Sequence, residues 1–276
     1  MPLAVCATPI GNLDDVTLRV LRELAEADLV LCEDTRRTSI LLRRHGLSAR
    51  LLSYHEHNEA ERTAQMLPRL HAGERVALVS DAGLPGVSDP GARLITAALE
   101  AHVPVTVLPG ASAVETALVA SGFAAERYQF LGYLPRGRAA LSALWEELQR
   151  WPWPAVAFES PRRLPMSLAS LARVHPDRVV AVCRELTKQF EEIVRATAPE
   201  VAERFAEPPR GEVTVVIGPA RAGRPNAGRE LGVETVAELV AAGVPRRQAA
   251  DVVSRLTGSS RNRLYRSSLS RECNHV

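Results

Sequence analysis

Lys188 is the only lysine in the chain, because 33 of the 34 basic residues are arginine. A lysine ammonium is a compact charge whose pKa responds to its surroundings, whereas arginine stays charged. Glu185 lies three residues before Lys188 in the run RELTK. The pair is therefore a candidate for acid–base or electrostatic catalysis. A surface ion pair, with one lysine left by chance in an arginine-rich composition, is the alternative.

Four other runs of unusual composition each follow a short apolar stretch. They are TPIGNL (8–13), EDTR (33–36), SDAGLPGVSDPG (80–91) and PGAS (109–112). Glycine and proline gather where the backbone turns sharply or approaches a ligand closely. No GxxxxGK[ST] run occurs and no GxGxxG follows a strand, which excludes a P-loop and makes a standard dinucleotide site unlikely. Neutral turns with Asp34 and Asp81 favour a ligand that has hydroxyls and a positive centre.

The apolar periodicity places these runs at one edge of a sheet. We predict strands at 3–7, 29–32, 75–79 and 105–108, and helices at 15–25, 36–45, 59–72, 91–101 and 113–121. Strands that alternate with helices form a parallel sheet. Ligands of such sheets bind outside the carboxyl ends of the strands, so four loops at that edge predict a binding site.

The second half predicts a mixed sheet, because its later strands have short connections. Strands are expected at 127–133, 155–158, 178–182, 190–196 and 212–217, and helices at 138–150, 162–174 and 199–205. Further helices are expected at 234–242, 246–256 and 261–269. The predicted fold class is α/β, with two α/β domains (1–112 and 113–220), a linker (221–228) and a small C-terminal helical domain (229–276).

Composition excludes several classes of protein. The chain has 276 residues, 46% hydrophobic and 24% charged, as in ordinary globular proteins. No apolar run is long enough for a transmembrane helix, and the N-terminus lacks the basic start of a signal peptide. The four cysteines form no CxxC pair, which argues against a zinc cluster and fits a reducing cytosol.

The C-terminal segment is basic. Residues 221–276 hold ten arginines and five acids, whereas the other 220 residues hold 24 bases and 27 acids. This asymmetry favours an anionic partner, with nucleic acid first; a solvated helical face is the alternative. In 244–266, one apolar face (Ala249, Val252, Val253, Leu256), a stop at Gly258 and a cap at Ser259 or Ser260 predict a helix-turn-helix. It would present Arg246, Arg247, Arg261, Arg263 and Arg266 to phosphates, unless it is a dimerisation module.

Two histidines and two acids each have more than one interpretation. His55 and His57 alternate as on a strand and would share a face, but no third metal ligand is signalled; a polar cleft wall or an RNA contact is the better interpretation. Glu33 and Asp34 could simply begin a helix, where acids are favoured.

Seven runs in one order resemble the tetrapyrrole-methylase fold family: TPIGNL, EDTR, SDAGLPGVSDPG, LPGASA, ESPR, RELTK and GEVTVVI. Within it, the chain is similar to the bacterial enzymes that methylate a cytidine 2′-hydroxyl of 16S ribosomal RNA. The resemblance covers residues 3–218, and the basic segment is similar to that branch's RNA-binding domain. It implies S-adenosylmethionine as methyl donor, bound between two α/β domains, and a homodimer.

The resemblance assigns residues to the donor cleft. They are Thr8, Pro9, Gly11 and Asn12; Ser80, Asp81, Ala82 and Gly83; Pro109, Gly110, Ala111 and Ser112; Glu159 and Ser160; and Gly211 to Val213 near the adenine. The loop after the third strand would hold the amino-acid and ribose parts of the donor. Leu84 stands where the family has a small polar residue, which puts a side-chain contact there in doubt.

The chemistry of methyl transfer needs mainly alignment and exclusion of water. A ribose hydroxyl is a poor nucleophile, so a base or a cation beside it would help. The catalytic candidates are Lys188, Glu185, Asp34 and Glu33. His55 and His57 are two further candidates for this role. Lys188 could act by its charge or, if its pKa is depressed, as the base. Arg36, His55 and His57 are candidates for contact with RNA.

Three functions remain open on this sequence. The first is a cytoplasmic ribose methyltransferase whose partners are 16S ribosomal RNA and the 30S subunit, with no metal and no membrane. The second is a small-molecule tetrapyrrole methylase of the same fold, against which the basic segment argues, because a tetrapyrrole has no phosphate backbone. The third is a non-catalytic assembly factor, against which the four intact loops and the lone lysine argue.

Overall fold

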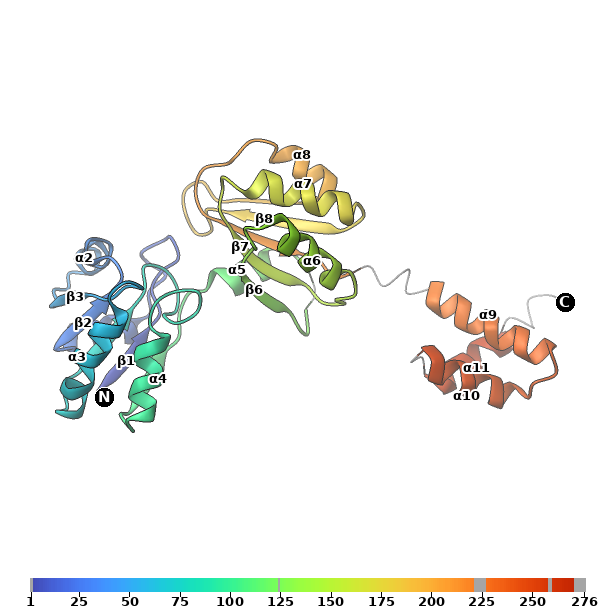
Figure 1. The fold of residues 1–276 in the computed structure, drawn as a ribbon, viewed down its shortest axis with the longest axis horizontal. Coiled ribbons are helices and arrows are strands. Elements are labelled where there is room, and N and C mark those ends of the chain that lie inside the picture. The colour runs from blue at the N-terminus through green and yellow to red at the C-terminus, as the bar shows by residue number, and fades with distance from the viewer. Residues whose placement is uncertain (1, 124, 221–226, 258–259, 271–276) are drawn as a thin grey trace. The chain divides into compact units, whose positions relative to one another are not determined.

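The computed structural model describes residues 2–123, 125–220, 227–257 and 260–270. The chain forms two compact units, Met1–Pro219 and Ala220–Val276, and Figure 1 labels most of their elements. Among the described residues, no helix combines the length and the apolar character needed to cross a bilayer.

The first sheet is parallel throughout, as predicted. Its order is β3-β2-β4-β1-β5. The strands are β1 (Leu3–Cys6), β2 (Leu29–Cys32), β3 (Leu51–Ser53), β4 (Val76–Val79) and β5 (Val105–Leu108). The strand β1 lies between β4 and β5 and pairs with both in matching register, Leu3 opposite both Val76 and Val105. All strands therefore end at one edge.

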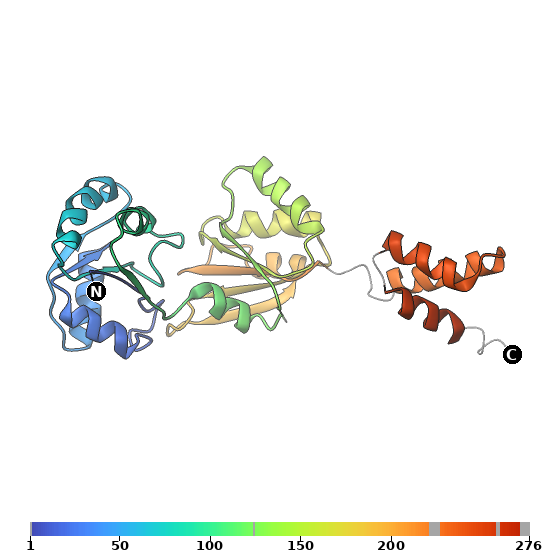
Figure 2. The same cartoon turned by 90° about the horizontal axis from the view of Figure 1, so that it is seen from below.

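Helices cover both faces of this sheet because its strands are apolar on both sides (Figure 2). They are α1 (Leu18–Glu26), α2 (Thr35–Arg44), α3 (Glu59–His71) and α4 (Ala92–Glu100). Successive strand residues point to opposite faces. Leu3 therefore packs in one core with Met66 of α3 and Leu94 of α4, whereas Ala4 packs in another with Leu24 of α1. Continuous apolar strands of this kind are typical of parallel sheets.

The second sheet is mixed, as predicted. Its order is β6-β7-β10-β8-β9, and only β6 and β7 pair in parallel. The strands are β6 (Gln129–Tyr133), β7 (Ala155–Glu159), β8 (Val179–Arg184), β9 (Glu192–Thr197) and β10 (Val213–Ile217). One face packs on α6 (Arg138–Gln149), α7 (Leu164–Val174) and α8 (Ala198–Arg204), and the other on α5 (Ala113–Ala120). Ile10, from the loop after β1, joins the α5 core.

The second unit contains three helices in its described part, α9 (Ala227–Ala241), α10 (Arg246–Thr257) and α11 (Arg261–Ser270). They enclose a small core that includes Val236, Ala249, Val253 and Leu264. The predicted face of α10 is wrong at Leu256, which is 80% exposed, whereas Ala250 is buried. The reason is that α10 packs against both α9 and α11, so its buried arc turns toward Ala250.

Other corrections concern the ends of elements. The first helix begins at Leu18 because the Thr17 hydroxyl caps it by accepting from the Val20 amide. The helix α9 begins at Ala227, inside the predicted linker, of which residues 221–226 lie outside the described residues, as do Gly258 and Ser259. His55 and His57 do not lie on a strand. They follow the unpredicted strand β3, in a turn that the Asn58 carboxamide closes by accepting from the His55 amide.

Candidate active site

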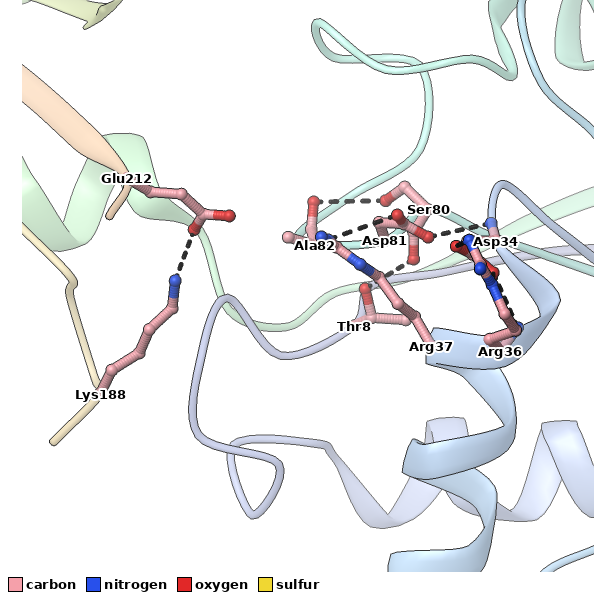
Figure 3. Close-up of polar contacts among 9 residues, drawn as sticks. All are labelled: Thr8, Asp34, Arg36, Arg37, Ser80, Asp81, Ala82, Lys188 and Glu212. Carbon is pink, nitrogen blue, oxygen red and sulfur yellow. Dashed lines mark hydrogen bonds and ion pairs between the residues drawn. The ribbon is translucent and has the colours of Figure 1, made fainter. Parts of the chain in front are cut away.

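The loops after β1 and β4 are joined into one wall at the carboxyl edge of the first sheet. The Thr8 amide donates to Gly83 O (2.8 Å), and the Gly83 amide donates to Thr8 O (3.0 Å). The buried Thr8 hydroxyl also donates to Ser80 O (3.0 Å; Figure 3). Gly83 has φ 79°, a left-handed conformation that favours glycine. The two loops thus hold each other in place.

A cavity of about 840 Å³ opens at this wall, and the second sheet closes its other side. We call it the larger cavity. Its lining includes the predicted residues Glu33, Asp81, Ala82, Gly83, Pro109, Gly110, Ala111, Ser112, Glu159, Ser160 and Gly211 to Val213. Phe130, Tyr133, Phe158 and Leu84 add aromatic and apolar surface. The volume suits a small organic ligand or cofactor.

Three carboxylates give the larger cavity an acidic side. Burial raises the pKa of Asp89 to about 7, and the nearby charges of Glu33 and Asp81 contribute to the increase. Burial also raises the pKa of Glu33, with Asp81 adding to the effect. Asp81 accepts from the Asp34 amide (3.0 Å) and lies 3.4 Å from Arg37. Asp89, by contrast, has no hydrogen bond or ion pair within the described part of the chain, so it suits a cationic ligand.

Asp34 has a structural role in the folded protein. It is the N-cap of α2, and its Oδ1 accepts from the Arg36 amide (2.8 Å). The Arg36 guanidinium pairs with its Oδ2 at 2.7 Å. The hydrogen bonds from the Arg36 side chain, and then from its amide, lower the pKa of Asp34 to about 2. Asp34 and the exposed Arg36 line neither of the two cavities described here, so the helix-start alternative explains Asp34.

Lys188 lies in a network with two carboxylates. Its Nζ donates to Glu185 Oε1 and to Glu212 Oε2, both at 2.9 Å (Figure 3 shows the second bond). Burial alone would lower the pKa of Lys188, but the hydrogen bonds to Glu185 and Glu212 outweigh burial and raise it. The side chain therefore stays an ammonium, which favours electrostatic action over proton abstraction.

The loop after β1 presses against the RELTK turn. A Cβ at Gly11 would lie 2.5 Å from Lys188 Cγ and 2.7 Å from Leu186 O, so only glycine fits. The Asn12 amide donates to the Thr187 hydroxyl (2.9 Å). Glu185 and Thr187 have φ of 52° and 65°, which costs energy in residues with a Cβ. The contacts of Gly11 and Asn12 with the RELTK turn bring Lys188 to the carboxyl edge of the first sheet.

A smaller cavity of about 260 Å³ lies beside the larger one. Its lining includes the predicted residues Thr8, Pro9, Gly11, Ser80, Asp81, Ala82 and Lys188. Glu185 lines neither cavity and reaches the site through Lys188. Apart from Asn12, which lines neither cavity, the structure thus distributes the predicted donor-cleft residues over two neighbouring cavities.

Glu159 is 2% exposed, and its carboxylate accepts hydrogen bonds from other groups of the protein. It accepts from the Ser160 amide (2.7 Å), Arg163 (2.9 Å) and the Ser167 hydroxyl (2.5 Å). Its geometry therefore fixes the turn after β7. Glu115, which also lines the larger cavity, accepts from the hydroxyls of Ser112 and Tyr128.

The predicted RNA-contact residues are scattered. His55 bonds to Asn58, and its ring lies 5.9 Å from that of the exposed His57. In the second unit, Arg247 and Arg261 are exposed, whereas Arg246 donates to Ser268 O (2.8 Å). Arg263 and Arg266 lie on α11, but their side chains fall outside the described residues.

Among the residues that line the larger cavity, sequence reasoning did not single out the polar side chains of Arg37, Asp89, Glu115 and Tyr128. Arg37 stands beside the chosen Arg36, and the exact start of α2 decides which of the two faces the cavity. Asp89 lies in the SDAGLPGVSDPG run, where an acid between turn residues was the available signal. Glu115 and Tyr128 meet only through the tertiary fold, so no local pattern marks them.

Comparison with known proteins agrees with this geometry. Residues 2–202 match the family model described as tetrapyrrole (corrin/porphyrin) methylases. A protein named "Ribosomal RNA small subunit methyltransferase I" from Mesorhizobium japonicum is 41% identical over 96% of this chain and 90% of its own length. Proteins of the same name from Synechocystis (38%; 98% of each chain) and Thermotoga maritima (41%; 78% of this chain, 97% of its own) also match.

Solved structures show the same fold. The methyltransferase CobJ superposes with a TM-score of 0.61 at 22% identity, over 79% of this chain and 94% of its own. A uroporphyrin-III C-methyl transferase from Thermus thermophilus, complexed with S-adenyl homocysteine, superposes with a TM-score of 0.56 at 22% identity, over 78% and 96%. With the family model matched over most of its length, this chain belongs to the tetrapyrrole (corrin/porphyrin) methylase family.

Proposed function

We propose that this protein transfers a methyl group from S-adenosylmethionine to the 2′-hydroxyl of a cytidine in small-subunit ribosomal RNA. The observation that carries the proposal is a match of 96–98% of this chain to relatives named small-subunit ribosomal RNA methyltransferases. The ribose hydroxyl and the cytidine come from the resemblance of the seven sequence runs. The cavities at the carboxyl edge of the first sheet supply a site in which this chemistry can occur.

The larger cavity fits the methyl donor. S-adenosylmethionine has a positive sulfonium, polar ribose and amino-acid groups, and a flat aromatic base. The Asp89 carboxylate, which has no hydrogen bond or ion pair to any described residue, suits the positive charge, and Phe130 and Phe158 offer aromatic surface. A Cβ at Gly110 would come within 2.9 Å of Ala7 Cβ, so the loop after β5 needs glycine to lie close to the end of β1.

We keep the donor-binding residues as a proposal, divided by the geometry into contact and support. Contact with the donor is proposed for the residues that line the larger cavity: Asp81, Ala82, Gly83, Pro109, Gly110, Ala111, Ser112 and Ser160. Pro9, Gly11 and Ser80 line only the smaller cavity, so they are proposed to support the donor site through the loops after β1 and β4. Support is proposed for Glu159, whose carboxylate is engaged within the protein.

Lys188 and Glu212 are proposed to act on the acceptor hydroxyl. When bound, the donor supplies an activated methyl group, so the protein must align the hydroxyl and stabilise its developing negative charge. Lys188 stays protonated and lies at the smaller cavity, and Glu212 lines both cavities. Lys188 would stabilise the alkoxide and Glu212 would take the hydroxyl proton. Glu185 would position Lys188, and Glu33 would be a second carboxylate near the donor.

The test is methyl transfer from radiolabelled S-adenosylmethionine to 30S subunits. Alkali cleaves RNA by attack of the 2′-hydroxyl on the neighbouring phosphate, so a 2′-O-methylated nucleotide resists it. We expect label in alkali-resistant dinucleotides. Label in mononucleotides would mean methylation of a base, and label on a tetrapyrrole but not on RNA would favour the small-molecule methylase. No transfer to any acceptor, despite donor binding, would favour the assembly factor.

The setting follows from this substrate. We propose that the protein works in the cytoplasm, on the 30S subunit or its RNA, as a homodimer and without a metal. Light scattering of the purified protein tests the dimer. Turnover that survives a chelator is expected, and its loss would contradict the metal-free mechanism.

A further inference from the structure

The smaller cavity shares a wall with the larger one. Five residues line both: Ile10, Arg37, Asp81, Ala82 and Glu212. Groups bound in the two cavities would therefore come close to each other at these five residues. Transfer between two ligands requires such contact, because the reacting atoms must approach within about 3–3.5 Å.

The rest of the smaller cavity has a distinct chemical character. Leu13, Ile40 and Leu41 give it an apolar side, and Lys188 and Arg37 provide its cations. The Arg37 side chain is 61% exposed and lies 3.4 Å from Asp81, its one ion-pair partner within the described ranges of the chain, so most of its donors can reach a ligand. An apolar or aromatic body next to an anionic group is the ligand that this lining would take. A nucleotide has both.

The helix α2 extends the cationic surface away from this cavity. Arg36, Arg37, Ile40, Arg43 and Arg44 are all exposed, and their spacing of three and four residues places them along one side of the helix. Arg36 and Arg44 pair with Asp34 and Asp14. Arg43 has no ion pair among the described residues. Arginine guanidinium groups along a helix suit the phosphates of a nucleic-acid strand.

We propose that the smaller cavity and the exposed arginines of α2 form the acceptor subsite, which takes one nucleotide of single-stranded RNA. The ribose of that nucleotide lies toward the shared wall and Lys188, and the neighbouring phosphates lie along Arg37 and Arg43. This inference rests on the proposed function. A cavity of about 260 Å³ is too small for a base pair, so the nucleotide must be unpaired, as is usual for sequence-specific RNA recognition.

The substitution Ile40→Trp tests the subsite by filling it. Ile40 is 48% exposed, so a larger side chain can project into the cavity mouth without disturbing the core. We expect the affinity for S-adenosylmethionine, measured by calorimetry, to stay within twofold. The rate of a single turnover on 30S subunits, with protein in excess, should fall by about 10²-fold, the cost of misplacing a reacting group.

Two further variants complete the experiment. Leu18→Trp places the same side chain on α1 at a residue that is 77% exposed and lines neither cavity; its turnover should match the wild type. Ile40→Glu repels phosphates without adding much bulk, so it tests the subsite if the tryptophan variant folds poorly. At low salt its turnover should be lower than that of the wild type, and the difference should shrink as salt screens the added charge.

The outcomes separate this inference from the proposed function. If the wild type labels RNA and both Ile40 variants label it at the same rate, the acceptor lies elsewhere and only this inference fails. A loss of donor affinity in Ile40→Trp, with folding intact, would assign the smaller cavity to the donor and overturn the inference as well. If the wild type labels no RNA, the proposed function fails.

Discussion

Lys188 is held as an ammonium by Glu185 and Glu212, and this decides its chemical role. Their hydrogen bonds raise its pKa despite partial burial, so at neutral pH it has no free lone pair to accept a proton. It can instead stabilise negative charge on an acceptor oxygen. Its position at the smaller cavity agrees with that role.

We predict that Lys188→Ala lowers kcat by about 10²–10³-fold, as for other groups that stabilise an oxyanion. Donor affinity by calorimetry should remain, because Lys188 does not line the larger cavity. Lys188→Arg keeps the charge but not the compact shape, and should recover part of the rate. Unchanged turnover in the alanine variant would remove Lys188 from the mechanism.

Asp89 predicts a pH-dependent affinity for the donor. Its pKa is raised to about 7, first by burial and then by Glu33 and Asp81; Arg37, Tyr133 and Glu212 also line the cavity it faces. The carboxyl is neutral below pH 7 and negative above it, and only the negative form attracts a sulfonium. Affinity for S-adenosylmethionine should therefore rise by about tenfold from pH 6 to pH 8.

The demethylated product lacks the sulfonium charge and provides the matched ligand. Its affinity should vary much less over the same range, and Asp89→Asn should remove most of the difference between the two ligands. Asp177→Asn, at an exposed residue outside both cavities, is the control. Calorimetric titrations at several pH values check the prediction. An equal loss of affinity for both ligands in Asp89→Asn would place the carboxylate at a group that they share.

The same pKa has a consequence for the stability of the ligand-free protein. The folded-state pKa of Asp89 lies above the ordinary value of 3.8, so folding is favoured by protonation and loses stability as the pH rises from about 4 through 7. Asp89→Asn should therefore raise the melting temperature at pH 8 more than at pH 5. A melting temperature that the substitution lowers at pH 8 would contradict this assignment.

At the scale of elements, α2 organises the site. It begins at the carboxyl end of β2, directs Arg37 to both cavities, and exposes Ile40 and Arg43. Asp34 caps it. An acid at a helix start and a catalytic acid look alike in sequence, so only the hydrogen bonds of Asp34 separate the two interpretations.

We predict that Asp34→Ala lowers the melting temperature by about 2–4 °C through loss of the cap. Asp34→Ser restores a side-chain cap without a carboxylate, and should restore both melting temperature and turnover. Thermal unfolding and the methyl-transfer assay measure the two effects. A serine variant that is stable but inactive would show that the carboxylate itself takes part in catalysis.

The secondary structure was largely predictable because most elements show either a continuous apolar run or a regular spacing of apolar residues. Leu29–Cys32 and Val76–Val79 are continuous apolar runs, and α1, α3 and α4 have apolar faces that local sequence displays. The strand β3 was missed because Leu51–Ser53 is too short to show a period. The start of α9 was missed because Gly228 and the surrounding small residues favour a linker.

At the scale of the whole molecule, the two cavities and the predicted RNA-binding arginines of the C-terminal segment belong to different units. Both cavities belong entirely to Met1–Pro219, which has its own cores. The second unit exposes Arg247 and Arg261. The Thermotoga relative, which aligns over 97% of its own length, leaves about a fifth of this chain unmatched.

We predict that a chain ending at Pro219 keeps its donor affinity but has a KM for 30S subunits at least about tenfold higher. Its kcat should change less, because Lys188 and Glu212 remain. The salt dependence of KM should also weaken, by about one unit of slope for each phosphate that the shortened chain no longer binds. If the shortened chain has the same KM and the same salt dependence, the second unit is not the RNA anchor.

The sequence by itself determined the alternation of strands and helices, and hence the parallel sheet and the edge where its loops meet. That inference works because apolar periodicity and turn chemistry are local properties. Only the tertiary structure decided which groups meet at the site. It placed Gly11 against Lys188, joined Lys188 to Glu212, left Asp89 unpartnered among the described residues, and chose Arg37 over Arg36. Contacts between residues far apart in the chain depend on packing and on the rotation of each helix, and no local pattern records them.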